Sequence, residues 1–113
     1  MSDTIFTKII NKEIPADIVY EDDLCLAFKD ISPQAPVHLL VIPKKPLVSL
    51  IESTSEDSAV LGHMMHKTAE IAETAGVGDA YRVVVNNGAK AGQSVFHIHL
   101  HILGGRLFTW PPG

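Results

Sequence analysis

The chain has 113 residues, a formal net charge of −4 and a single cysteine. This length suits one domain, the lone cysteine excludes an intrachain disulfide, and the acidic balance argues against a protein that coats nucleic acid non-specifically. Residues 1–10 carry Asp3 and Lys8 without a long apolar run, and no stretch approaches the roughly 20 apolar residues that cross a bilayer. We therefore expect a cytoplasmic protein that has no membrane partner.

The first predicted element is a short helix over residues 4–11. Either Asp3 or Thr4 can cap its N-terminus. Its apolar residues recur at helical spacing: Ile5, Phe6, Ile9 and Ile10. Such a short helix must be held by packing, and two interpretations fit it. The pattern by itself favours a helix that covers the core, and the alternative is one wall of a ligand pocket.

Three predicted strands follow the helix. Residues 18–21 and 24–28 flank an Asp-Asp pair and predict a β-hairpin. Residues 37–42 form a third strand that is apolar on both faces, which predicts a central position in the sheet. His38 lies on this strand and is either a hydrogen-bonded core histidine or a partner of the histidines near the C-terminus.

Residues 53–75 form the one long predicted helix, with capping residues at its start and an apolar stripe at helical spacing. His63 and His66 lie three residues apart on it, a spacing that can bind a metal ion. Because no acidic or cysteine partner stands beside them, we expect a surface or interface role for both. Residues 81–86 are rich in β-branched side chains and predict a fourth strand.

The stretch over residues 94–103 carries three histidines at alternate positions. Because alternation is the period of a β-strand, His97, His99 and His101 are expected on one face, with aliphatic side chains on the other. A glycine-rich loop over residues 88–94 runs directly into this strand. The order of elements predicts an α+β fold in which the strands form an antiparallel meander with the long helix on one face.

Three interpretations of this histidine strand stay open. Two adjacent imidazoles could share one zinc ion if another ligand, such as His38, completed the site. Alternatively, a neutral imidazole could attack phosphorus, with backbone N–H groups near Gly92 and Val95 and the Ser94 hydroxyl stabilising the transition state. The third interpretation is that the histidines are structural. Three alternating histidines beside an anion-binding loop favour nucleophilic catalysis over the other two.

The segment His-Ile-His-Leu-His-Ile-Leu over residues 97–103 resembles the histidine triad motif, in which histidines alternate with apolar residues. The resemblance is to the histidine triad (HIT) superfamily, and to its nucleotide-binding (Hint) branch in particular. Further segments that resemble this branch are residues 3–6, 12–16, 28–36, 41–45, 92–95 and 110–113. The terminal Trp-Pro-Pro-Gly separates the branch from the dinucleoside polyphosphate hydrolases and the galactose-1-phosphate uridylyltransferases.

This resemblance implies a single HIT domain over residues 1–113, built on a five-stranded antiparallel sheet with one long and one short helix. It implies a homodimer whose two sheets join into ten strands, and Phe108 and Trp110 in the C-terminal segment are typical of such an interface. The implied activity is that of a purine nucleoside phosphoramidase, which hydrolyses the P–N bond of adenosine 5′-phosphoramidates and aminoacyl adenylates. The alternative is an AMP- or GMP-binding interaction protein with vestigial hydrolysis. Neither a metal nor a cofactor is implied.

The resemblance also assigns residues. His99 is expected to be the nucleophile, with His97 and His101 orienting it and moving protons, His38 nearby and Ser94 assisting. The expected walls of the purine pocket are Ile5, Phe6, Ile9 and Phe28, which reverses the preference stated above for the first helix. The ribose and base are expected to meet Asp30 and Ile31. The phosphate and leaving group are expected to lie against Asn86, Gly92, Ser94 and Val95.

Overall fold

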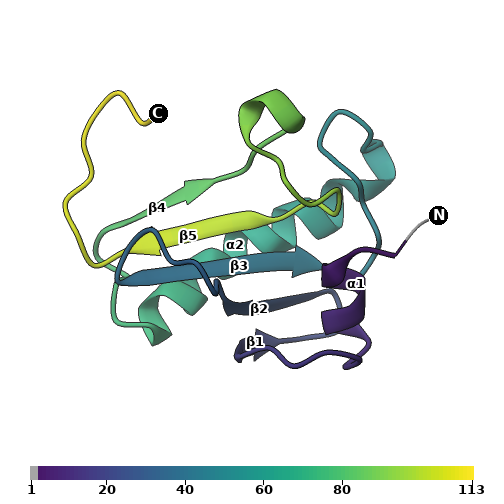
Figure 1. The fold of residues 1–113 in the computed structure, drawn as a ribbon, viewed down its shortest axis with the longest axis horizontal. Helices are drawn as coiled ribbons and strands as arrows, with labels where there is room; N and C mark the ends of the chain where they lie inside the picture. The colour runs from purple at the N-terminus through teal and green to yellow at the C-terminus, as the bar shows by residue number, and fades with distance from the viewer. Residues whose placement is uncertain (1–2) are drawn as a thin grey trace.

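A five-stranded antiparallel sheet lies between two helices in the computed structural model, which describes residues 3–113 (Figure 1). The helices and strands are α1 (Ile5–Ile10), β1 (Ile18–Glu21), β2 (Cys25–Lys29), β3 (Val37–Pro43), α2 (Ser58–Thr74), β4 (Tyr81–Val84) and β5 (Leu100–Gly104). Two single 3₁₀ turns, η1 (Ser55–Asp57) and η2 (Ala89–Ala91), complete the secondary structure of this range. The predicted α+β fold and the central position of β3 are confirmed.

The strand order is β1-β2-β3-β5-β4, so the predicted simple meander is wrong at its second half. The first three strands do form a meander. α2 then crosses one face of the sheet and delivers the chain to the far edge, where β4 lies. The last strand, β5, returns to the middle and pairs with both β3 and β4. In this order β3 and β4 are not neighbours in the sheet. The chain can connect them because α2 spans a longer distance than a hairpin turn could.

The predicted hairpin between β1 and β2 is confirmed, and Asp22 explains its turn. One carboxylate oxygen of Asp22, Oδ1, accepts hydrogen bonds from the backbone N–H groups of Leu24 at 2.8 Å and Cys25 at 2.9 Å. A short side chain that bonds the backbone two and three residues ahead fixes a turn locally. The hairpin therefore holds Asp22 in one orientation.

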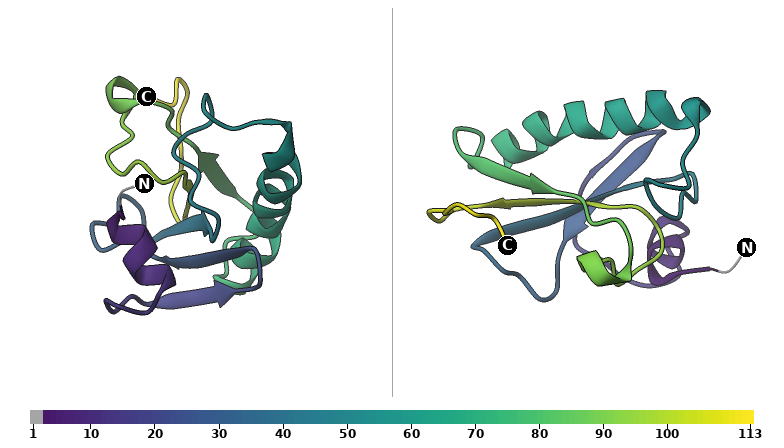
Figure 2. Two further views of the ribbon diagram at one scale, coloured as in Figure 1. Left: turned by 90° about the vertical axis from the view of Figure 1, so that its right-hand side faces the viewer. Right: turned by 90° about the horizontal axis from the view of Figure 1, so that it is seen from above.

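Successive residues of β2 and β3 point to opposite faces of the sheet and build two separate cores. The two helices lie on opposite faces of the sheet (Figure 2). The core under α2 contains Cys25, Ala27, Leu39, Val41, Met64 and Ile71. The core under α1 contains Phe6, Ile9, Leu26, Phe28, Leu40 and Ile42. Since α1 has only six residues, its stability comes from this packing together with an N-terminal cap by Thr4.

The predicted strand over residues 94–103 begins only at Leu100, which corrects the expectation of three histidines in a row on one strand face. The preceding residues follow an irregular path, in which a backbone N–H bonds to a loop residue and not to a sheet partner. The backbone N–H of Ile98 donates to the carbonyl of Leu47 at 2.7 Å. Of the three histidines, only His101 lies in β5.

Two further boundaries differ from the sequence prediction. The long helix starts at Ser58 rather than residue 53, because Thr54 caps the separate turn η1 and Asp57 accepts the Thr54 N–H at 2.9 Å. β4 ends at Val84 rather than residue 86. Neither helix in residues 3–113 combines the length and apolarity that crossing a bilayer requires.

Candidate active site

A cleft of about 580 Å³ lies between α1 and the sheet face that carries His101. Many of the predicted residues line it, namely Ile5, Phe6, Ile9, Phe28, Asp30, Ile31, Ser94, Val95, His99 and His101. Sequence reasoning missed further lining residues: Ile14, Pro15, Ala16, Asp17, Lys29 and Leu40. The residues after α1 gave no periodic signal, because they form a loop whose position depends on the packing of the helix.

One half of the cleft is apolar, and its aromatic side chains pack against one another. Phe6 packs edge-on against Phe28, with ring centroids 5.5 Å apart, and against the His99 ring at 5.0 Å. At the rim, Ile31 is 96% exposed and Ile5 is 51% exposed. Exposed aliphatic side chains beside aromatic rings form a surface that a flat, partly apolar ligand can cover.

Asp30 stands between the apolar half and the histidines. Its Oδ1 accepts the backbone N–H of Ser32 at 2.8 Å, and its Oδ2 lies 3.4 Å from His38 Nε2. The half-buried carboxylate therefore faces the cleft as a fixed acceptor, which suits ligand hydroxyl groups.

His97 is buried behind the cleft and is held by the backbone. Its Nε2 lies 2.8 Å from the carbonyl oxygen of Pro43. Because a carbonyl can only accept, Nε2 must carry the proton and donate it. Burial lowers the pKa of His97 below its usual value, so the ring is neutral near pH 7.

His99 lines the cleft with one nitrogen fixed and the other free to react. Its Nδ1 lies 2.9 Å from the carbonyl oxygen of His97 and must donate to it. Burial lowers the pKa of His99, so the neutral ring keeps an unprotonated lone pair on Nε2. This tautomer is the one that a nucleophilic imidazole needs, and the carbonyl group of His97 sets it.

His101 is fixed by a chain of hydrogen bonds that starts at Gln34. The backbone N–H of Gln34 donates to His38 Nδ1 at 3.0 Å, so Nδ1 is the acceptor and the ring proton of His38 lies on Nε2. That proton points to His101 Nδ1, 3.0 Å away, which leaves His101 with its own proton on Nε2. Burial and the neighbouring His99 and His38 lower the pKa of His101 to about 4. His99 and His101 thus have opposite roles, one as an acceptor and the other as a donor.

The sheet register explains how His38 meets His101. In the β3–β5 pair, Leu40 lies opposite His101 and His38 lies opposite Leu103. Directly opposite residues share a face, so the two histidines are diagonal neighbours on the side of α1. The sequence could place each histidine on a strand, but the pairing of β3 with β5 required the tertiary structure.

The loop before the histidines is organised by Gln93, which sequence reasoning did not identify as a site residue. Its buried side-chain amide donates to the carbonyl groups of Val48 at 2.7 Å and Val95 at 3.1 Å, and its carbonyl accepts from Gly88 N–H at 2.9 Å. These bonds present Ser94 and Val95 to the cleft. In the sequence, the only signal for Gln93 was its position within the glycine-rich loop.

Asn86 and Gly92 were expected to contact the phosphate and leaving group, but in the described part of the chain, residues 3–113, neither lines the cleft. The two residues lie beside each other. Gly92 has φ of +103°, a conformation that favours glycine, and a side chain there would meet the Asn86 amide. In this structure the two residues therefore shape the loop behind Ser94.

A metal ion has one candidate set within this site. Ligand atoms of Asp30, His38 and His101 lie within 4.8 Å of one another. The two facing nitrogens of His38 and His101 also lie within hydrogen-bond distance of each other, at 3.0 Å. The predicted sharing of a zinc ion by the adjacent histidines His97 and His99 finds no support in residues 3–113, because no third ligand joins these two in a cluster of ligand atoms within 4.8 Å of one another.

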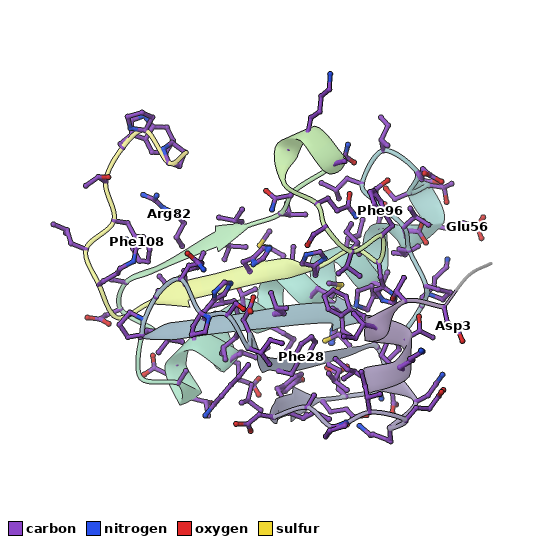
Figure 3. All side chains as sticks on the ribbon, viewed as in Figure 1. Asp3, Phe28, Glu56, Arg82, Phe96 and Phe108 are labelled. Carbon is purple, nitrogen blue, oxygen red and sulfur yellow. The ribbon has the colours of Figure 1, made fainter. Side chains whose placement is uncertain are left out.

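The C-terminal segment lies at the opposite end of the molecule from α1 (Figure 3). Phe108 packs between the guanidinium groups of Arg82, at 5.1 Å, and Arg106, at 4.2 Å. Trp110 is 81% exposed and Leu107 is 87% exposed. This segment of the chain therefore presents a free apolar surface far from its own cleft.

Comparison with known proteins identifies the family. The sequence matches the family model of the HIT domain over residues 11–107. An uncharacterised HIT-like protein of Synechocystis sp. is 68% identical over 111 residues, covering 98% of this chain and 97% of that protein. A 14 kDa zinc-binding protein of Zea mays is 50% identical over 114 residues, covering 99% of this chain and 89% of that protein.

Solved structures agree with the sequence matches. A HIT family hydrolase from Legionella pneumophila superposes with a TM-score of 0.95 at 46% identity, covering 98% of this chain and 100% of that chain. A histidine triad protein from Clostridium difficile superposes with a TM-score of 0.91 at 43% identity, covering 96% of each chain. The chain belongs to the histidine triad (HIT) family and is similar over nearly its whole length to a hydrolase of that family.

Proposed function

We propose that this protein is a purine nucleoside phosphoramidase of the nucleotide-binding branch of the family. The observation that carries the proposal is the pair of opposite tautomers in the cleft, with an unprotonated Nε2 on His99 beside a protonated Nε2 on His101. The first supplies a nucleophile and the second a proton donor, which together match the cleavage of a bond between phosphorus and a basic leaving group.

The cleft suits a nucleoside monophosphate unit. A purine would lie in the apolar half against Phe6 and Phe28, under the exposed side chain of Ile31. The ribose hydroxyl groups would meet the carboxylate of Asp30. The phosphate would then lie near the Ser94 hydroxyl and the backbone N–H groups of this segment, where fixed donors stabilise the charge of the transition state.

The reaction would run in two steps. His99 Nε2 attacks the phosphorus and the P–N bond breaks. The departing amine takes the Nε2 proton of His101 while His101 Nδ1 takes the Nε2 proton of His38, and solvent on the Asp30 side replaces the proton of His38, so that neither ring is left as an anion. Water then attacks the phosphorus, returns a proton to His101 Nε2 and releases His99 and the nucleoside monophosphate.

Turnover of adenosine 5′-phosphoramidate tests the proposal. Wild type should hydrolyse it, and His99→Ala should lose at least about a thousandfold in kcat, because the covalent route is removed. The matched control is His66→Ala, which removes an exposed histidine of α2 and should keep the wild-type rate. Equal turnover by wild type and His99→Ala would refute the mechanism.

A rapid quench with phosphorus-labelled substrate tests the intermediate directly. Peptide mapping should find the nucleotidyl group on His99, and label on another histidine would overturn the assignment. If AMP binds but amine leaving groups of every kind are retained, the alternative of a binding or regulatory protein with vestigial hydrolysis takes its place.

We also propose that two copies associate through β4 to form a ten-stranded sheet. Support comes from β4, which is the edge strand of the described chain, and from the exposed Leu107 and Trp110 at the same end. An edge strand with free backbone groups can pair with a second copy. Sedimentation at micromolar concentration should give the mass of a dimer, and a monomeric mass would refute this proposal.

A further inference from the structure

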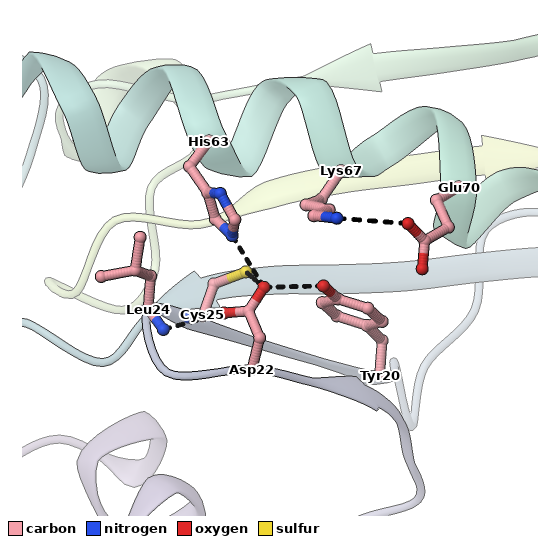
Figure 4. Close-up of polar contacts among 7 residues, drawn as sticks. All are labelled: Tyr20, Asp22, Leu24, Cys25, His63, Lys67 and Glu70. Carbon is pink, nitrogen blue, oxygen red and sulfur yellow. Dashed lines mark hydrogen bonds and ion pairs between the residues drawn. The ribbon is translucent and has the colours of Figure 1, made fainter.

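A second cluster of reactive side chains lies on the face of the sheet that α2 covers, opposite to the nucleotide cleft (Figure 4). Asp22 comes from the β1–β2 turn, Cys25 from the start of β2 and His63 from α2. One ligand atom from each lies within 4.8 Å of the other two. The proposed hydrolysis uses none of these residues.

The carboxylate of Asp22 is oriented before any ligand arrives. Its Oδ1 is occupied by two backbone N–H groups, as described for the hairpin turn. Its Oδ2 points the other way, 2.7 Å from His63 Nε2 and 3.8 Å from Cys25 Sγ. The Tyr20 hydroxyl lies 2.6 Å from the same oxygen. Four side chains from three elements therefore converge on one point.

The separations fit a tetrahedral zinc ion. Zinc binds thiolate sulfur at about 2.3 Å and nitrogen or oxygen at about 2.0–2.1 Å, so tetrahedral angles require about 3.3 Å between N and O and about 3.5 Å between S and O. The observed N···O separation of 2.7 Å is about 0.6 Å shorter than the tetrahedral value, and the observed S···O separation of 3.8 Å is about 0.3 Å longer. Rotation of the partly exposed His63 ring would lengthen the N···O separation, and a small rotation of the Cys25 side chain would shorten the S···O separation.

We propose that Asp22, Cys25 and His63 form a structural zinc site that joins the β1–β2 hairpin to α2. On binding, the Cys25 thiol loses its proton to solvent and the thiolate sulfur bonds to zinc. His63, whose Nε2–H donates to Asp22 before zinc binds, gives up this proton to solvent, carries its ring proton on Nδ1 and binds through Nε2, and Asp22 binds through Oδ2. The Tyr20 hydroxyl, or a water molecule at this half-exposed edge, takes the fourth position.

This donor set distinguishes the site from the cluster in the cleft. The three residues Asp30, His38 and His101 offer nitrogen and oxygen only. The cluster under α2 adds a sulfur ligand, which zinc prefers over the hard cations magnesium and calcium. A zinc ion at Cys25 would also be shielded on its inner side, because this residue is fully buried.

Cobalt substitution and zinc titration of the full-length protein test the site without any assay of activity. Cobalt-loaded wild type should show the near-ultraviolet sulfur-to-cobalt charge-transfer band, since Cys25 is the only cysteine. Calorimetric titration with zinc should give one ion per chain. His63→Ala, Asp22→Asn and Cys25→Ser should each weaken zinc binding by more than about 100-fold, the upper end of what losing an outer-shell partner costs.

The matched control is His66→Ala, three residues along α2, which should bind zinc like wild type. His38→Ala should also bind normally, because it disrupts only the cluster in the cleft. Circular dichroism verifies that each variant is folded, and the cobalt band of wild type decides the matter even if Cys25→Ser does not fold. Absence of that band, absence of stoichiometric zinc, or zinc binding that survives His63→Ala but not His38→Ala would overturn the proposal.

Discussion

The lowered pKa of His101 predicts a measurable loss of stability in mild acid. The pKa of this ring is about 4 in the folded protein, against 6.5 for an ordinary histidine. Between these two values the unfolded chain binds more protons than the folded chain does. Stability from this group is therefore complete above pH 6.5 and falls as the pH drops towards 4.

Linkage gives the size of the effect. With pKa values of 6.5 and about 4, His101 should cost about 2 kcal/mol of unfolding free energy between pH 8 and pH 5. His97 and His99, whose pKa values are also lowered by burial, add to the loss with the same sign. The carboxylates with lowered pKa act only at more acidic pH, because their unfolded values lie near 4.

Urea denaturation at pH 8 and pH 5 measures this difference. His101→Asn keeps an acceptor for the His38 proton but cannot titrate, so its stability should fall by about 2 kcal/mol less than that of wild type over the same interval. His66→Ala, at an exposed helical position, controls for the loss of a histidine as such and should keep the wild-type dependence. Identical pH dependence in wild type and His101→Asn would refute the argument that burial excludes the proton.

Three further predictions follow from single groups. Ile31→Ala should raise KM several-fold in the proposed reaction and leave kcat unchanged, as steady-state kinetics would show. Because the Ile31 side chain is 96% exposed, the same change should alter the free energy of unfolding by less than about 0.5 kcal/mol in urea denaturation. Gln93→Ala should lower the free energy of unfolding by about 1–3 kcal/mol, because it leaves buried backbone groups unpaired. The control Gln34→Ala removes an exposed side chain and should lower it far less, and chemical denaturation of both variants measures the difference. Burial raises the pKa of the Cys25 thiol to about 12, so iodoacetamide should label it at pH 8 only after unfolding, as mass spectrometry would show.

Much of the secondary structure could be predicted, because it depends on local pattern. The apolar spacing of residues 4–11 predicted α1, and the Asp-Asp pair predicted the hairpin whose turn Asp22 fixes. The candidate site was less accessible. Alternation placed His101 correctly on a strand, but it failed for His97 and His99, whose rings are held by the backbone carbonyls of Pro43 and His97, respectively.

The partners of single side chains also escaped the sequence. His63 was expected to lack an acidic or cysteine partner, and this expectation was wrong, because the hairpin brings Asp22 to within 2.7 Å of it and places Cys25 in the same cluster. These residues are 41 and 38 positions away from His63 along the chain. No local spacing rule applies at that separation.

The sequence by itself determined where the helices and most strands lie, which face of each strand is apolar, and which family the motif resembles. These properties follow from periodicity and turn residues, which act over a few positions. Only the tertiary structure decided that β5 lies between β3 and β4, and that His99 and His101 carry opposite tautomers. The strand order and the His38–His101 hydrogen bond depend on contacts between segments distant in the chain. The His99 tautomer depends on the carbonyl of His97, two residues away, which the irregular path of this segment holds in place once both cores have packed.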